Sequence, residues 1–235
     1  EGRPVDEAAL AEAVRQSVHE VAKKQLQVGI DIVNDGEHAK SGFQYYARAR
    51  LSGHQPREYP EGEGPPYLNT AGRDYLSFPG FFAKRGGTYK RRRSFVTGPI
   101  RYTGLEAAKT DIANLKSAIA GLNVAEGMLM AVTPGTIEHW LHDEYYGNQE
   151  KFLFAIADAM HEEYKAITDA GLLVHIDAPD FADSWQIYPD MTIAEYGTYT
   201  ELRVAALNHA LKGIPADRVI VHTCWGSFHN PHTND

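Results

Sequence analysis

The sequence predicts an α/β fold in which parallel strands alternate with helices. Short apolar runs that read as strands are separated by longer segments with helical periodicity. These runs are apolar on both faces, which is typical of a sheet covered by helices on both sides. Polar side chains gather where the strands end, as at the carboxyl-terminal face of a (β/α)8 barrel. We therefore expect a (β/α)8 TIM barrel that is incomplete in this chain, with its first and last strands missing.

Four segments carry the apolar stripe and the end signals of a helix. The first follows an apparent N-cap at Asp6 and ends at Gly29. The second has its apolar face between Ile112 and Leu122. The third begins after Asn148 and ends at Gly171, and the fourth opens with a capping box at residues 192–195 and ends at Gly213.

About five runs read as barrel strands, and together with the helices they favour one domain over residues 1–235. Residues 51–93 have many Gly, Pro, Tyr and Arg residues and little periodicity, so we interpret them as an irregular insertion with room for a hairpin. An open doubly wound sheet is the competing architecture. It more often carries a glycine-rich phosphate loop, and the sequence has none. The five expected strands are residues 30–33, 94–99, 128–132, 172–177 and 218–224.

The composition excludes several classes of partner and location. A formal net charge of -8 disfavours nucleic acid and anionic membranes, and the basic run at residues 90–93 reads as a solvated loop. The single cysteine cannot form a disulfide framework, which favours a reducing compartment. Neither a long apolar stretch nor the apolar core of a signal peptide is present, so we expect a cytoplasmic location.

The last expected strand ends in a His-x-Cys pair, His222 and Cys224. Residues two apart on a strand share a face, so the imidazole and the only thiol project to the same side. The pair could supply half of a tetrahedral zinc site. The alternative is structural, because single cysteines are commonly buried as small apolar residues and single histidines are commonly hydrogen-bonded.

Four strand-end motifs, in this order, resemble the C-terminal catalytic barrel of cobalamin-independent methionine synthase and its shorter stand-alone relatives. This superfamily includes uroporphyrinogen decarboxylase. The four motifs extend through most of the chain, which makes the set more specific than any single motif. They are residues 29–37, 96–99, 169–179 and 222–224.

This resemblance implies zinc-dependent transfer of a methyl or other alkyl group to a thiol. The metal keeps the substrate sulfur deprotonated, and the thiolate is the nucleophile. His222 and Cys224 match two family zinc ligands, while Glu37 and Asp177 match carboxylates that hold the amino group of homocysteine. The alternative role for both carboxylates is capping or turn bonding.

Two departures from the family pattern limit these expectations. The family completes its zinc site with a Glu and a second Cys on later strands, so we expect the chain to be a portion of a longer protein and the remaining ligands to lie outside it. His229 and His232 are the candidate substitutes in an unusual site, but histidines in such a loop more often lie behind the direct ligands or are solvated, which is the favoured interpretation.

The second departure concerns the methyl donor. The family carries a Trp a few residues beyond a Thr-Gly-Pro turn, where it stacks on the folate. We place Thr97 in that turn, and Tyr102 stands where the Trp is expected, which leaves a folate-type donor open. Trp140 and Trp225 are further pocket candidates, with burial in the core as the alternative.

The leading functional expectation is methionine synthesis of the 5-methyltetrahydropteroyltriglutamate-homocysteine S-methyltransferase type, with a small thiol and a methyl donor as partners. Alkyl transfer to another thiol such as coenzyme M, or a catabolic demethylation, is the alternative within the superfamily. A non-catalytic barrel that acts as a binding subunit and a metal-dependent lyase or decarboxylase are alternatives from other classes. The oligomeric state, including a homo-oligomer, is left open.

Overall fold

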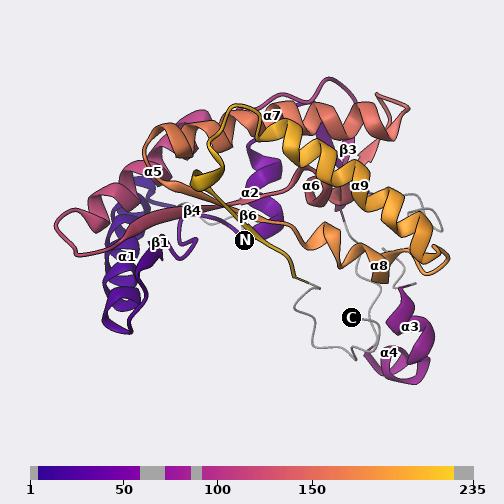
Figure 1. Ribbon diagram of the computed structural model, residues 1–235, viewed down its shortest axis with the longest axis horizontal. Coiled ribbons are helices and arrows are strands. Elements are labelled where there is room, and N and C mark those ends of the chain that lie inside the picture. Colours follow the sequence, from indigo (N-terminus) through magenta and orange to yellow (C-terminus); the bar gives the residue numbers. More distant parts are fainter. Residues whose placement is uncertain (1–4, 59–71, 86–91, 225–235) are drawn as a thin grey trace.

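The computed structural model describes residues 5–58, 72–85 and 92–224 (Figure 1). Short connections join helices and strands in alternation, as expected for an α/β fold. In chain order the elements are α1 (Glu7–Gln27), β1 (Ile32–Asn34), α2 (Phe43–Ala49), β2 (His54–Glu58), α3 (Arg73–Ser77), α4 (Pro79–Arg85), β3 (Arg92–Val96), α5 (Leu105–Ile119), β4 (Glu126–Val132), α6 (Pro134–Trp140), β5 (Leu141–Asp143), α7 (Gln149–Asp169), β6 (Leu173–Asp177), η2 (Pro179–Phe181), α8 (Ser184–Ile187), α9 (Ile193–Ala210), η3 (Ala216–Arg218) and β7 (Val219–His222).

A parallel sheet of four strands, in the order β1-β4-β6-β7, forms the centre of the fold. Its two middle strands alternate in burial because successive side chains point to opposite faces. Leu129, Ala131, Val174 and Ile176 are buried on the face that contacts α5 and α7. Figure 1 shows these helices along that face, with α9 against α7 and α1 against α5. On the opposite face, Met128, Met130, His175 and Asp177 are half-buried, whereas Val132 and Leu173 are buried.

Three of the four expected helices, α1, α7 and α9, begin where the sequence predicts. The side chains of Asp6 and Asn148 accept hydrogen bonds from the first turns of α1 and α7. Thr192 and Glu195 form the expected capping box of α9. α6 was not predicted, although Thr133 caps it and Pro134 opens it, a common first helical residue. No described helix combines the length and the apolar character needed to cross a membrane.

The expected strand at residues 94–99 forms as β3, but it does not join the parallel sheet. It pairs antiparallel with β2, from His54 opposite Val96 to Glu58 opposite Arg92, and parallel with β5. β1 instead pairs directly with β4. The α/β class and the parallel sheet are therefore confirmed, whereas one of the five strands belongs to a second sheet of three strands.

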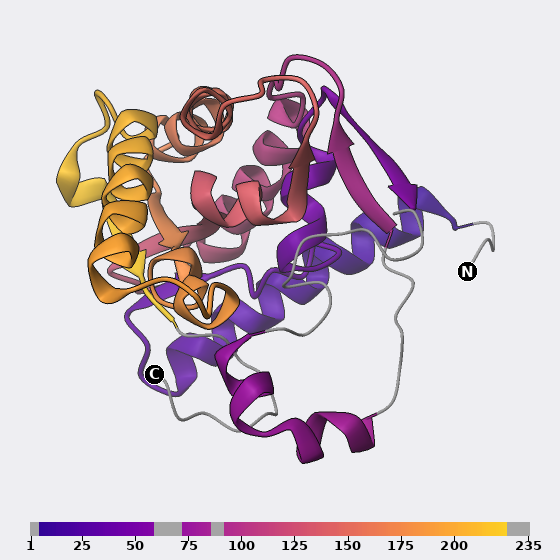
Figure 2. The same cartoon turned by 90° about the vertical axis from the view of Figure 1, so that its right-hand side faces the viewer.

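The segment at residues 51–93 has more regular structure than its composition predicts. Besides β2 it contains α3 and α4, which Figure 2 shows as a pair set apart from the main body. Arg73 links α3 to α8 and the loop after it, because its side chain donates to the carbonyl groups of Trp185, Tyr188 and Met191. Its guanidinium group also lies 3.4 Å from the centre of the Trp185 ring, a cation–π contact.

Candidate functional site

The candidate site begins where β6 and β7 end. Asp177 and His222 are directly opposite each other in the parallel ladder, and His175 lies two residues before Asp177. These side chains therefore share the half-buried face of the sheet. The rings of His175 and His222 meet edge to face, with their centres 5.8 Å apart.

Burial sets the ionisation of this cluster. It raises the pKa of Asp177, and the neighbouring His175, His222 and Lys40 oppose that rise. Burial lowers the pKa of His175, against the influence of Asp177 and Glu37. Neither ring nitrogen of His175 has a hydrogen-bond partner among the described residues. The loop after β1 lies beside these strands: Lys40 Nζ is 3.6 Å from Glu37 Oε1 and donates to the carbonyl of Met130, which is opposite His175 in the ladder.

That loop carries Glu37 in an uncommon backbone conformation. Its φ is 57°, in the left-handed region that non-glycine residues rarely adopt, and Gly36 before it has φ 63°. Two side-chain acceptors stabilise the turn: Asn34 Oδ1 accepts from the Gly36 amide at 2.8 Å, and Asp35 Oδ1 accepts from the Glu37 amide at 3.0 Å. A strained residue held by its surroundings is a common feature of functional sites.

His222 and Cys224 are close in sequence at the end of β7. His222 is exposed, and the free thiol of Cys224 is half-buried. Imidazole nitrogen and thiolate sulfur are donors that suit zinc, so the two residues fit half of a tetrahedral site. Within the described ranges, however, no three His, Cys, Asp or Glu side chains are grouped so that they could hold a metal.

Two other predicted site residues lie elsewhere. Thr97 is exposed after β3, in the second sheet, and its amide donates to the Gly53 carbonyl at 2.9 Å. Tyr102 is buried, and its hydroxyl donates to Glu163 at 2.5 Å. The structure therefore groups Glu37, Asp177 and His222 but does not place Thr97 on the same sheet edge.

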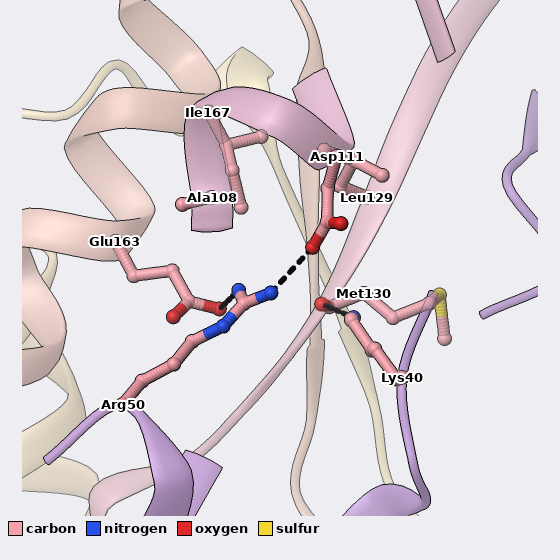
Figure 3. A pocket seen from close by; sticks show the side chains of 8 residues that line it. All are labelled: Lys40, Arg50, Ala108, Asp111, Leu129, Met130, Glu163 and Ile167. Carbon is pink, nitrogen blue, oxygen red and sulfur yellow. Dashed lines mark hydrogen bonds and ion pairs between the residues drawn. The ribbon is translucent and has the colours of Figure 1, made fainter. Parts of the chain in front are cut away.

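Tyr102 belongs to a buried ionic network that links α2, α5 and α7. Arg50 Nη2 lies 2.5 Å from Asp111 and Arg50 Nη1 lies 3.3 Å from Glu163. Figure 3 shows this arginine between the two carboxylates, at a cavity of about 10 Å³ that Lys40 also lines. Burial alone would lower the pKa of Arg50, but Glu163 and Asp111 outweigh it and raise the pKa.

A Thr-Pro-Gly turn follows β4, the strand that actually lies between β1 and β6. The amide of Thr133 donates to the Asp177 carbonyl at 3.0 Å, which joins this turn to the end of β6. Trp140, at the end of α6, is half-buried and packs edge to face on Phe43, with ring centres 5.2 Å apart. Thr-Pro-Gly at the start of α6 and a Trp at its end thus follow β4, whereas the Thr-Gly-Pro sequence that begins at Thr97 follows β3.

Sequence reasoning missed Lys40, His175 and the Thr133 turn. Lys40 follows Glu37 by three residues, and His175 precedes Asp177 by two on the same face, so spacing alone could have indicated both. Some predicted residues cannot be placed. His229, His232, Trp225 and the first half of the basic run at residues 90–93 lie outside the described residues.

Comparison with known proteins identifies relatives over nearly the whole chain. No family model matches. The chain is 25% identical to a methionine synthase of Sulfolobus acidocaldarius over 232 residues, which make up 97% of this chain and 56% of that protein. It is 26% identical to a methionine synthase of Saccharolobus solfataricus over 230 residues, 96% of this chain and 57% of that protein. The chain thus spans somewhat more than half the length of these curated relatives.

Among solved structures, the chain superimposes on a B12-independent methionine synthase from Shewanella sp. W3-18-1 in complex with selenomethionine, with a TM-score of 0.65 and 20% identity. The match covers 94% of this chain and 54% of that one. The fold is therefore that of the B12-independent methionine synthases. The resemblance to the cobalamin-independent methionine synthase family, expected from the strand-end motifs, is confirmed over nearly the whole chain.

Proposed function

We propose that the protein containing this chain transfers a methyl group to the thiol of homocysteine without cobalamin. The observation that carries the proposal is the grouping at the carboxyl end of the parallel sheet: Asp177 is opposite His222, and Cys224 is two residues beyond His222. Glu37 is linked to the same sheet through Lys40, which donates to the Met130 carbonyl opposite His175. The names of the relatives support the same reaction.

In this proposal Glu37 and Asp177 bind the ammonium group of the amino-acid substrate. Two anions facing one ammonium group form charge-assisted hydrogen bonds, which are stronger than neutral ones. The solved relative that is described as a complex with selenomethionine holds an amino acid that carries such a group. The half-buried position of Asp177 partly excludes water, so its interaction with a cation is stronger than at the surface.

His222 and Cys224 would hold zinc together with ligands from outside this segment. When bound, zinc supplies a positive charge that lowers the pKa of a coordinated thiol and keeps the nucleophile ionised. His175 supports this assignment, because it is next to His222 and its two nitrogen atoms lack partners in the described part of the chain.

The remaining expectations stay proposals. The complete protein would be a (β/α)8 barrel, with residues 1–235 in one domain interrupted at about 51–93. Near the donor site, we propose that the Thr133 turn and Trp140 take the place first given to Thr97 and Tyr102, because their strand lies between β1 and β6. A folate-type donor and a cytoplasmic location stay predictions, and the oligomeric state stays open.

The test is to measure zinc and methyl transfer together in the complete protein. We expect about one zinc per chain and methylation of homocysteine from a methyltetrahydrofolate donor. Cys224→Ser should lose zinc and activity while keeping its circular dichroism spectrum, since a catalytic site is built on a folded scaffold. Zinc content that is unchanged in this variant contradicts the metal assignment. A wild-type protein that binds neither zinc nor thiol favours the non-catalytic binding subunit.

A further inference from the structure

Lys40 is a buried cation next to the candidate site. Its side chain is only 2% exposed, whereas lysines are almost never buried unless they are paired. The positive charge of Lys40 lowers the pKa of Asp177, in opposition to the larger increase that burial causes. Lys40 contacts Glu37 directly at 3.6 Å, and its hydrogen bond to the Met130 carbonyl places it beside β4, the strand that pairs with the Asp177 strand.

The Lys40 ammonium group makes three contacts, with a carbonyl group, a carboxylate and an aromatic ring. Nζ donates to the Met130 carbonyl, lies 3.6 Å from Glu37 Oε1 and stands 4.4 Å from the centre of the Tyr46 ring. The first contact follows from the sheet, because β1 pairs with β4 only as far as Asn34 opposite Met128. Beyond that point the Lys40 side chain, and not β1, donates a hydrogen bond to β4. The same ammonium group faces Glu37.

Glu37 needs such support because its backbone is strained. A left-handed φ is sterically unfavourable for a non-glycine residue, and Glu37 adopts it at the point where the chain leaves β1. The backbone amide of Lys40 donates to the Glu37 carbonyl at 2.9 Å, and its side chain reaches the Glu37 carboxylate. One residue therefore restrains Glu37 at both ends.

We propose that Lys40 is a positioning residue that holds the Glu37 carboxylate in place for the ammonium group of the substrate. The inference rests on the proposed function and adds a residue to it. Lys40 does not itself bind the substrate in this proposal, because its donors already face Met130, Glu37 and Tyr46. Charge alone would act the other way, since removing a cation beside Glu37 strengthens the attraction for an ammonium group. The sign of the effect therefore separates positioning from charge.

The experiment compares two ligands by calorimetry in the complete protein, with equal metal content in all samples. L-Methionine carries the ammonium group, and 4-(methylsulfanyl)butanoate is the same molecule without it. We expect Lys40→Met to weaken binding of L-methionine about tenfold, the loss of one charge-assisted contact, and to leave the second ligand within about twofold. Lys40→Arg, which keeps charge and donors, should restore most of the affinity. Lys109→Met is the matched control, because Lys109 is exposed and pairs with Glu106 on the same helix at 2.7 Å.

Each outcome decides the proposal. Unchanged or tighter binding of L-methionine by Lys40→Met overturns it, and so does an equal loss for both ligands, which indicates a purely structural role. If Lys40→Met does not fold, Lys40→Gln takes its place with the same expected loss. Wild-type protein that does not prefer L-methionine contradicts the proposed function itself and the role of Lys40 with it.

Discussion

In the proposed function, substrate selectivity depends most directly on Asp177. Removing one partner of a desolvated charge pair costs about 2 to 5 kcal/mol. We expect Asp177→Asn to lower kcat/KM for homocysteine by a factor that corresponds to this free energy. The variant should affect kcat/KM for a thiol without an amino group far less, and its zinc content should stay near wild type. Asp169→Asn, at an exposed pair with Lys165 on α7, is the control. An equal fall in activity with both thiols would make Asp177 a structural residue.

Asp180, three residues further on, has a carboxyl that burial makes harder to ionise. Burial raises its pKa, and hydrogen bonds from Thr133 and Thr136, together with the charge of Arg203, oppose the rise. Such a carboxyl binds more protons in the folded state than in the unfolded state at pH values above its ordinary pKa of about 3.9. The free energy of unfolding therefore falls as the pH rises through that range.

Asp180→Asn removes this titration, and we expect a shallower dependence of stability on pH from about pH 4 upward. Tyr164 and Tyr196 also interact with Asp180, but burial raises the pKa of both hydroxyls, that of Tyr196 to about 12, so they do not titrate in this range. Urea unfolding at a series of pH values measures the slope. Parallel curves for variant and wild type would contradict the assignment.

At the scale of elements, the first turn of α6 depends on Gly135. A Cβ atom there would overlap Asp180 Oδ2 and lie 2.9 Å from Arg203 Cγ. Gly135→Ala should therefore lower the free energy of unfolding by about 1 to 3 kcal/mol, as overpacking does. Gly197→Ala in α9 is the matched control, since its Cβ would meet no atom within 4 Å, and a gain of up to about 1 kcal/mol is expected. Equal effects in urea unfolding would refute this packing argument.

At the scale of the whole molecule, local signals in the sequence predicted most of the structure. Four of the five expected strands form the parallel sheet, and the caps at Asp6, Asn148 and Thr192 open the helices they were expected to open. Each of these features depends on residues that are adjacent or one turn apart. Of the candidate site, Glu37, Asp177 and His222 were chosen from the polar residues that follow expected strands and from the family resemblance, and the structure places them after β1, at the end of β6 and at the end of β7.

Pairing between distant segments could not be predicted in this way. β3 has the composition of a barrel strand, but its backbone groups form hydrogen bonds with the antiparallel strand β2. β1 therefore pairs with β4 and not with β3. The family motif was therefore assigned to Thr97, whereas the turn after β4 begins at Thr133. Buried charges were missed for a related reason, because Lys40 and Arg50 are ordinary surface residues until their partners are known.

Arg50 links three helices that are distant in the sequence. It follows α2 and forms ion pairs with Asp111 of α5 and Glu163 of α7. Removing one member of a buried ion pair leaves the other charges uncompensated, which typically costs about 3 to 5 kcal/mol. We expect Arg50→Met to lower the free energy of unfolding by that amount in urea unfolding. Arg15→Met is the control: Arg15 pairs with Glu12 on the exposed face of α1, where such pairs contribute about 0 to 1 kcal/mol. Similar losses in the two variants would mean that the buried network does not hold the three helices together.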